Sequence, residues 1–153
     1  MPDWLTHTLT GWIIGKTTKI NIALIVIGSL IPDLVKINIA FVWLGINHQH
    51  IFDPLHTPIG AFLIAGIGSL FFKDTKKAFI PLSIGVISHF VLDFLLVHLA
   101  GGARLFFPFS WNQLNYSLIR SEDYWMTVVA IVIAIIVFFI YKLYDQKIKI
   151  HVE

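Results

Sequence analysis

The segment from Ser88 to Asp93 contains an imidazole and a carboxylate four residues apart, inside an apolar stretch that runs from Ala78 to Ala100. Residues at this spacing share one face of a helix. Ionisable side chains within a membrane are energetically costly and normally face a bundle interior, where they carry out chemistry. His89 and Asp93 therefore have the spacing and the atom types of metal ligands. The alternative is that the two side chains only hydrogen-bond each other and the neighbouring backbone.

Three more candidate ligands, His7, Asp33 and His56, lie in or beside other apolar segments. Because the chain has no cysteine, a metal would be held by histidine, carboxylate and hydroxyl groups. Zinc is the first choice, since with such ligands and one open position it lowers the pKa of its water to about 7. Together the candidates exceed the ligands that this chemistry needs, so Asp33, beside a helix break, is favoured as a general base or as a residue that orients a ligand. For His56 the alternative is a position in the headgroup region, bound only to water.

The composition is that of an integral membrane protein. Of the 153 residues, 57% are hydrophobic and 13% are charged, and the mean hydropathy is +0.80. This composition is too apolar for a soluble domain of the same size, and the length suffices for one domain only. We therefore expect a single membrane-embedded domain over residues 1–153, with membrane lipids as partners and no nucleic acid.

The apolar segments that must position these ligands are predicted to be helices. Four of them are long enough, or nearly so, to cross a bilayer, namely residues 20–45, 58–72, 78–100 and 124–144. Pro32 interrupts the first segment, and because proline removes a backbone donor we expect a broken span there. Residues 4–15 are too short to cross and are predicted to form a half-span or an interfacial helix. The expected fold class is an all-α integral membrane protein with about four transmembrane helices.

Lysines predict the orientation of these helices, because they gather in one set of loops and near the C-terminus. They are Lys16 and Lys19, then Lys73, Lys76 and Lys77, then Lys142, Lys147 and Lys149, while Lys36, inside the broken span, is an ambiguous case. By the positive-inside rule, the chain is a multi-pass protein of the inner (cytoplasmic) membrane with its C-terminus in the cytoplasm. Measured from the lysine side along the helices, Asp33, His56, His89 and Asp93 lie at about 16 to 24 Å, within a hydrocarbon core of about 30 Å. His7 reaches the same layer if its segment dips in from the outer side.

Several short motifs together resemble one known family. They are Thr6-His7, Ile31-Pro32-Asp33, His56-Thr57, the segment from Ser88 to Asp93, and Phe107-Pro108-Phe109-Ser110. Their order and spacing are similar to those of the predicted membrane-bound metal-dependent hydrolases, the YdjM-like inner-membrane proteins. This resemblance implies four membrane helices and a metal centre of His and Asp, distantly similar to zinc-dependent phospholipase C. The chain departs from the family pattern after Asp33, where Lys36 follows instead of a second Asp, and at His48-Gln49-His50, where the family often has His-Arg-Gly.

The segment from Gly101 to Asn115 is too apolar for a free aqueous loop, while its proline and glycines prevent a spanning helix. We expect it to lie on, or dip into, the interface on the non-cytoplasmic side of the membrane. Arg104 is its only basic residue, and a planar guanidinium suits a phosphate or carboxylate headgroup, which makes Arg104 a candidate substrate clamp. Ordinary contact with lipid phosphates is the alternative. His48 and His50 have ligand-like spacing for a strand, although loop histidines are more often solvated.

Three classes of function remain open. The preferred one is a metal-dependent hydrolase that acts on a lipid or another amphiphile, and phosphoester, ester and amide substrates are all compatible with it. An ion or proton translocator also uses buried His and Asp, but it needs a polar path to both membrane faces, and the lysine-side halves of the spans offer almost none. The third class is a structural or regulatory membrane protein with a metal site, which would lack an open coordination position.

Overall fold

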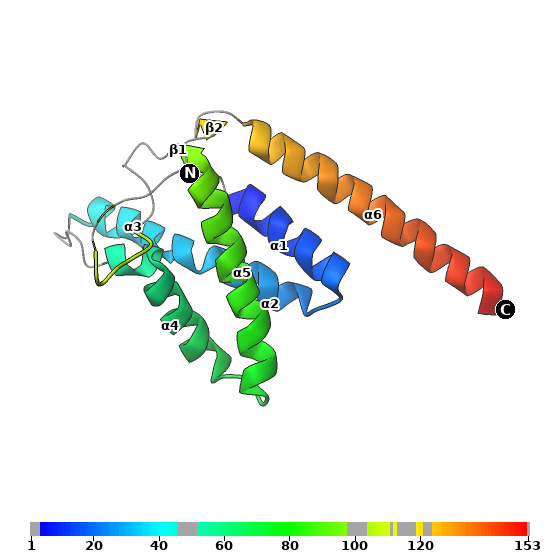
Figure 1. The fold of residues 1–153 in the computed structure, drawn as a ribbon, viewed down its shortest axis with the longest axis horizontal. Helices are drawn as coiled ribbons and strands as arrows, with labels where there is room; N and C mark the ends of the chain where they lie inside the picture. Colours follow the sequence, from blue (N-terminus) through cyan, green and yellow to red (C-terminus); the bar gives the residue numbers. More distant parts are fainter. Residues whose placement is uncertain are drawn as a thin grey trace.

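The computed structural model describes residues 4–45, 52–97, 104–110, 112, 119–120 and 124–152. Within them the chain is helical except for loops and one short strand pair (Figure 1). The elements in chain order are α1 (Trp4–Thr18), α2 (Ile22–Leu30), η1 (Pro32–Ile37), α3 (Asn38–Trp43), η2 (Asp53–His56), α4 (Pro58–Ser69), α5 (Thr75–Leu95), β1 (Leu96–Val97), β2 (Ile119–Arg120) and α6 (Trp125–Val152), where η1 and η2 are 3-10 helices. The two strands pair in parallel over two residues each.

The segment 20–45 is broken at Pro32, as the sequence predicts. Asn21 caps α2 by accepting a hydrogen bond from the Leu24 amide at 3.2 Å, and α2 ends at Leu30. The following helical piece, from Pro32 to Trp43, is bent by 47° relative to α2. A proline ring clashes with the preceding turn and leaves one carbonyl without its partner, so a straight α-helix cannot continue. The break buries Asp33 at the start of η1.

The number of membrane-spanning helices is lower than the four predicted. In the described part of the chain, two helices, Thr75–Leu95 and Trp125–Gln146, are long and apolar enough to cross a membrane, and the bent pair can make a third. α4 begins at Pro58, as predicted, and Thr57 caps it, but the helix has only 12 residues. A helix of that length extends about 18 Å, well short of the hydrocarbon core.

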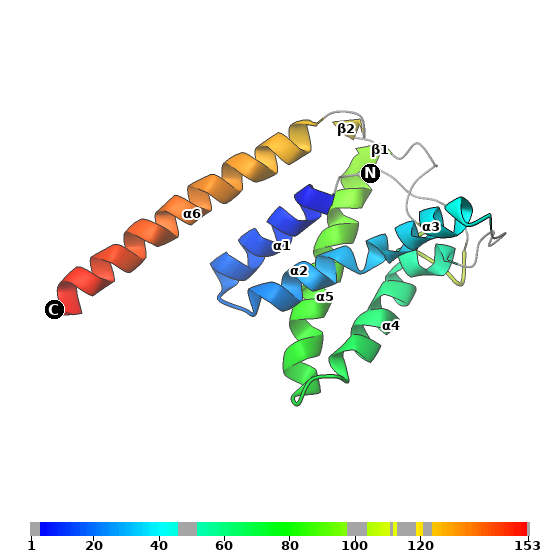
Figure 2. The same ribbon diagram turned by 180° about the vertical axis from the view of Figure 1, so that it is seen from behind.

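Small residues let the central helices approach closely. A Cβ atom on Gly28 would lie 2.1 Å from the Leu82 carbonyl oxygen, and one on Gly85 would lie 2.1 Å from the Ile25 carbonyl oxygen. These two glycines therefore set the crossing of α2 and α5, as small residues do in membrane helix pairs. α1 packs against α2, α4 packs against α5, and α6 packs against α1 (Figure 2).

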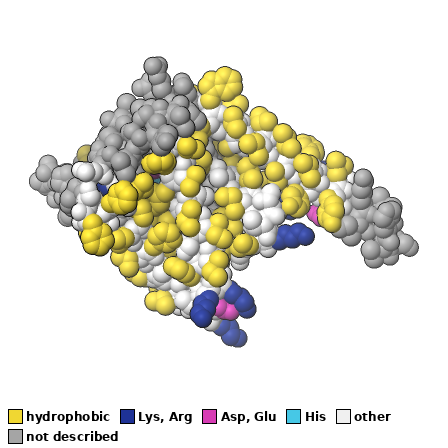
Figure 3. Space-filling view, in the orientation of Figure 1, with side chains coloured by type: hydrophobic (Ala, Val, Ile, Leu, Met, Phe, Trp, Pro, Cys, Tyr) yellow, Lys and Arg dark blue, Asp and Glu magenta, His cyan; other side chains and the backbone are white. Residues whose placement is uncertain are grey.

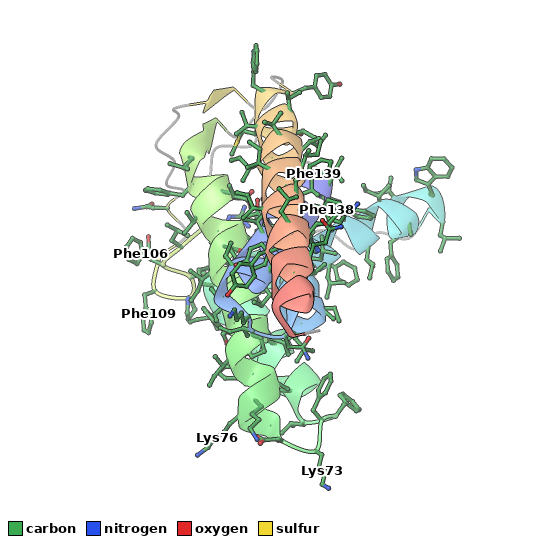
Figure 4. All side chains as sticks on the ribbon, turned by 90° about the vertical axis from the view of Figure 1, so that its right-hand side faces the viewer. Lys73, Lys76, Phe106, Phe109, Phe138 and Phe139 are labelled. Atoms are coloured by element: carbon green, nitrogen blue, oxygen red, sulfur yellow. The ribbon has the colours of Figure 1, made fainter. Side chains whose placement is uncertain are left out.

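The surface suits a membrane. Large apolar side chains are exposed along α3, α4, α5 and α6, and Figure 3 shows them over most of one face. An apolar patch of this extent is unfavourable in water and expected in lipid. Basic side chains gather at the turn between α4 and α5, where Lys73 and Lys76 extend outward (Figure 4). Phe106 and Phe109 also point away from the bundle, and Phe109 is 92% exposed.

The N-terminal helix is part of the bundle. Its 15 residues are too few to span, as predicted, but Thr6, His7, Gly11 and Gly15 are buried against neighbouring helices. The Thr6 hydroxyl lies 2.9 Å from the Thr127 hydroxyl, which ties α1 to α6. This packing makes α1 part of the helical bundle and buries His7 in the interior.

Candidate metal centre

α5 supplies the centre of the site. His89 and Asp93 lie on its buried face, with side chains 0% and 1% exposed, and His89 Nε2 is 3.3 Å from Asp93 Oδ2. The spacing of four residues thus brings the imidazole and the carboxylate together, as the sequence predicts. Ser88, which precedes His89, donates its hydroxyl hydrogen to the Gly85 carbonyl at 2.7 Å and does not belong to the cluster.

Two further histidines reach the same carboxylate from elsewhere in the chain. His56, at the end of η2, places Nε2 3.0 Å from Asp93 Oδ2 and 3.3 Å from His89 Nε2. His7, on α1, places Nε2 3.6 Å from Asp93 Oδ1, and its ring stacks on that of His89 with centroids 3.8 Å apart. His56 is 13% exposed and the other two histidines are at most 1% exposed, so the cluster opens toward His56.

The backbone of α2 orients His89. His89 Nδ1 lies 2.7 Å from the Ser29 carbonyl oxygen. A carbonyl oxygen only accepts hydrogen bonds, so Nδ1 carries the proton and the neutral ring offers its lone pair at Nε2. A backbone carbonyl behind the second ring nitrogen is the usual arrangement for a metal-binding histidine. The Ser29 hydroxyl lies 3.1 Å from the His7 carbonyl oxygen and 2.8 Å from that of Val26, where it satisfies helix carbonyls.

The potential ligand atoms form two overlapping groups. One group is His7, Asp33 and His89, and the other is His56, His89 and Asp93; in each, the ligand atoms lie within 4.8 Å of one another. His89 belongs to both groups, but only its Nε2 is available to bind an ion, because its Nδ1 donates to the Ser29 carbonyl. A neutral imidazole nitrogen has one lone pair to give, so the two groups describe one ion with alternative ligands better than two ions.

The residues fit a zinc-like ion. Ligand nitrogens about 2.0–2.1 Å from zinc stand about 3.3 Å apart at the corners of a tetrahedron, which is close to the 3.0–3.3 Å that separates the polar atoms of His56, His89 and Asp93. In addition, neither ring nitrogen of His7 has a hydrogen-bond partner among the described residues, although both are buried. Buried polar atoms without partners are rare, and an ion bound next to His7 would give one of its ring nitrogens a partner.

Asp33 lies at the edge of the cluster and has a cation of its own. Its Oδ2 is 2.8 Å from Lys36 Nζ, and the Lys36 ammonium lies over the Trp4 ring at 5.5 Å from the ring centroid. Lys36 was not among the site residues predicted from the sequence, where it stands only as a departure from the family pattern and an ambiguous case for the orientation. Its spacing of three residues from Asp33 on a helical segment is the signal that could have identified the ion pair.

Arg104 lies outside the cluster of ligands. Its Nη1 is 2.9 Å from Asp53 Oδ2, and both side chains are about three-quarters buried. Asp53 begins η2, the element that ends with His56, so the ion pair joins the aromatic segment 104–110 to the helix that carries a ligand. Nothing in the sequence signals Asp53 as the partner, because the two residues are distant in the chain. His48, His50 and His98 fall outside the described residues.

The comparisons with known proteins bear on the family and the membrane. The sequence matches the YdjM inner membrane protein family over residues 3–151. No curated protein and no solved structure matches the chain. The family name states no catalytic activity, so the hydrolase activity and the likeness to zinc-dependent phospholipase C stay predictions. Since the match covers nearly the whole sequence and the helices are apolar enough for a membrane, the chain belongs to the YdjM inner membrane protein family.

Proposed function

We propose that the protein is a membrane-embedded metal-dependent hydrolase that acts on a lipid or another amphiphile. The observation that carries this proposal is the convergence of five candidate ligands from four elements in two overlapping groups that share His89. His7 and Asp33 complete one group, and His56 and Asp93 complete the other. Burying two carboxylates and three imidazoles in an apolar bundle is costly, and an ion at their centre offsets that cost.

The proposed ion is a divalent metal, with zinc as the first choice. When bound, it would supply Lewis-acid chemistry, which lowers the pKa of water to about 7 and polarises a substrate oxygen. His56, His89 and Asp93 would hold it, with His7 as a further ligand. The Ser29 carbonyl keeps His89 in the tautomer that presents Nε2 to the cluster. Asp33 is the proposed proton acceptor, and its ion pair with Lys36 fixes the position of that carboxylate.

The access route favours an amphiphilic substrate. An apolar cavity of about 350 Å³ lies between α4 and α5 and is lined by Pro58, Phe62, Phe90 and Leu105, among others. The Phe90 ring is 5.8 Å from the His56 ring and 5.7 Å from the His89 ring, centroid to centroid. A hydrocarbon chain in this cavity would end next to the partly exposed His56. The segment 104–110 forms one wall of the cavity through Leu105. Arg104 is next to Leu105 in the chain and is therefore the proposed contact for a substrate headgroup.

Metal analysis and a turnover screen test the proposal together. The protein, purified without chelator, should contain about one transition-metal ion per chain by elemental analysis. It should hydrolyse at least one member of a panel of phospholipid, ester and amide substrates, and this activity should vanish with a chelator and return with zinc. Asp93→Asn should remove both metal and turnover, whereas Ile80→Ala, at an exposed position of the same helix, should keep both. A full complement of metal without turnover would favour the structural alternative, and absence of metal would refute the proposal.

A further inference from the structure

A second feature of the molecule, separate from the cluster of ligands, is a groove between α1 and α6. The groove has an apolar cavity of about 600 Å³, lined by Leu9, Trp12, Val26, Ile135, Phe138 and Phe139 with their neighbours. Phe138 and Phe139 mark its position on α6 in Figure 4. None of the five proposed metal ligands is among the residues that line it.

The groove has a polar end. A second cavity, of about 380 Å³, shares Phe138 with the first and is lined by Lys16, Tyr141, Lys142, Asp145 and Gln146. Lys16 Nζ lies over the Tyr141 ring, 5.3 Å from its centroid. Among the described residues, neither Lys16 nor Lys142 has a carboxylate within salt-bridge distance. Two ammonium groups and one carboxylate therefore line the polar end of a groove whose walls are otherwise hydrocarbon.

The groove is apolar along most of its length and charged at one end, and this order matches the acyl chain and the headgroup of a phospholipid. Along α6, the lining from Ile131 at the apolar end to Lys142, the first charged residue, is about 16 Å at 1.5 Å per residue, about half the thickness of a hydrocarbon core. That is the depth of one leaflet. Two lysines complement a phosphate, and the adjacent Asp145 carboxylate complements an ammonium group rather than a second anion.

We propose that the groove between α1 and α6 binds a phospholipid whose headgroup carries both a phosphate and a primary ammonium, as in phosphatidylethanolamine. The phosphate contacts Lys16 and Lys142, the ammonium contacts Asp145, and an acyl chain lies between Trp12 and Phe138. The lipid fills the space between α6 and the rest of the bundle, to which α6 is joined through α1. It is a bound structural lipid, distinct from the hydrolase substrate.

Native mass spectrometry of the full chain in mild detergent tests this assignment. The protein is titrated with phosphatidylethanolamine and, separately, with phosphatidylglycerol of the same acyl chains. We expect tighter binding of phosphatidylethanolamine, and a loss of about tenfold in its affinity in the double variant Lys16→Gln/Lys142→Gln. The matched control is Lys73→Gln/Lys76→Gln, which removes two exposed lysines of the α4–α5 turn and should bind as the unmodified protein does.

A third variant separates the two parts of the headgroup. Asp145→Asn should abolish the preference for phosphatidylethanolamine, because phosphatidylglycerol no longer meets a carboxylate. The proposal is overturned if the unmodified protein binds phosphatidylglycerol as tightly as phosphatidylethanolamine. It is also overturned if the Lys16/Lys142 and Lys73/Lys76 variants lose affinity for phosphatidylethanolamine to the same extent. It is also overturned if the Lys16/Lys142 variant keeps full affinity. Metal content should be the same in all variants, so these outcomes do not depend on the proposed hydrolase activity.

Discussion

At the scale of single residues, His89 has the most constrained position in the site. Its Nδ1 donates to the Ser29 carbonyl, its Nε2 faces His56 and Asp93, and its ring stacks on His7. Losing one ligand from a site with an open position leaves too few donors, so His89→Ala should remove the metal and all hydrolysis. Elemental analysis and turnover of His89→Ala beside Ile80→Ala measure this. Full metal content in His89→Ala would place the ion elsewhere.

Acid should release the metal before it unfolds the protein. Protons compete with the ion for the imidazole lone pairs, and free histidine has a pKa of about 6.5, so metal retention should fall as the pH drops below that value. Helical content should persist, because the apolar packing of the bundle carries no charge. Metal content and circular dichroism measured along one pH series test both statements. Retention that is constant far below pH 6 would argue against imidazole ligands.

The Arg104–Asp53 ion pair should affect substrate more than metal. Arg104→Ala should leave the metal content unchanged, since the ion-pair partner of Arg104 is Asp53, which is not one of the proposed ligands. If the guanidinium also contacts a headgroup, KM for a charged lipid should rise several-fold while kcat stays nearly constant. Asp53→Asn serves as the comparison, because it frees Arg104 without removing it. Equal changes in both variants would assign the pair to loop positioning alone.

At the scale of helices, the crossing of α2 and α5 determines the site. Gly85 lies one turn before His89, and a Cβ atom there would lie 2.1 Å from a backbone oxygen of α2. Gly85→Ala should therefore separate the two helices and cost about 1–3 kcal/mol in stability. It should also weaken metal binding, because the Ser29 carbonyl moves away from His89. Gly68→Ala, where nothing lies within 4 Å of the added carbon, is the control. Thermal unfolding and metal content distinguish the two.

At the scale of the whole molecule, the orientation in the membrane is open to a direct test. The sequence contains no cysteine, so single cysteines can be labelled without background. By the positive-inside rule, Phe109→Cys should react with a membrane-impermeant maleimide in intact cells. Lys76→Cys and Gln146→Cys should react only after permeabilisation. The reverse pattern would invert the topology, and labelling of Lys76→Cys and Gln146→Cys on different sides would change the number of crossings.

The amino-acid sequence alone determined the membrane class, the break at Pro32, the start of α4 and the pairing of His89 with Asp93, because these follow from composition and from local sequence patterns. It also predicted that His7, Asp33 and His56 converge with them.

Three features depended on contacts between segments far apart in the chain: the Ser29 carbonyl behind His89, the ion pair of Arg104 with Asp53, and the groove between α1 and α6. Only the tertiary structure could decide these, since the close crossing at Gly28 and Gly85 sets which distant residues meet. The length of α4 was also decided there, because the chain turns after Ser69 to begin α5 although the apolar sequence continues to Phe72.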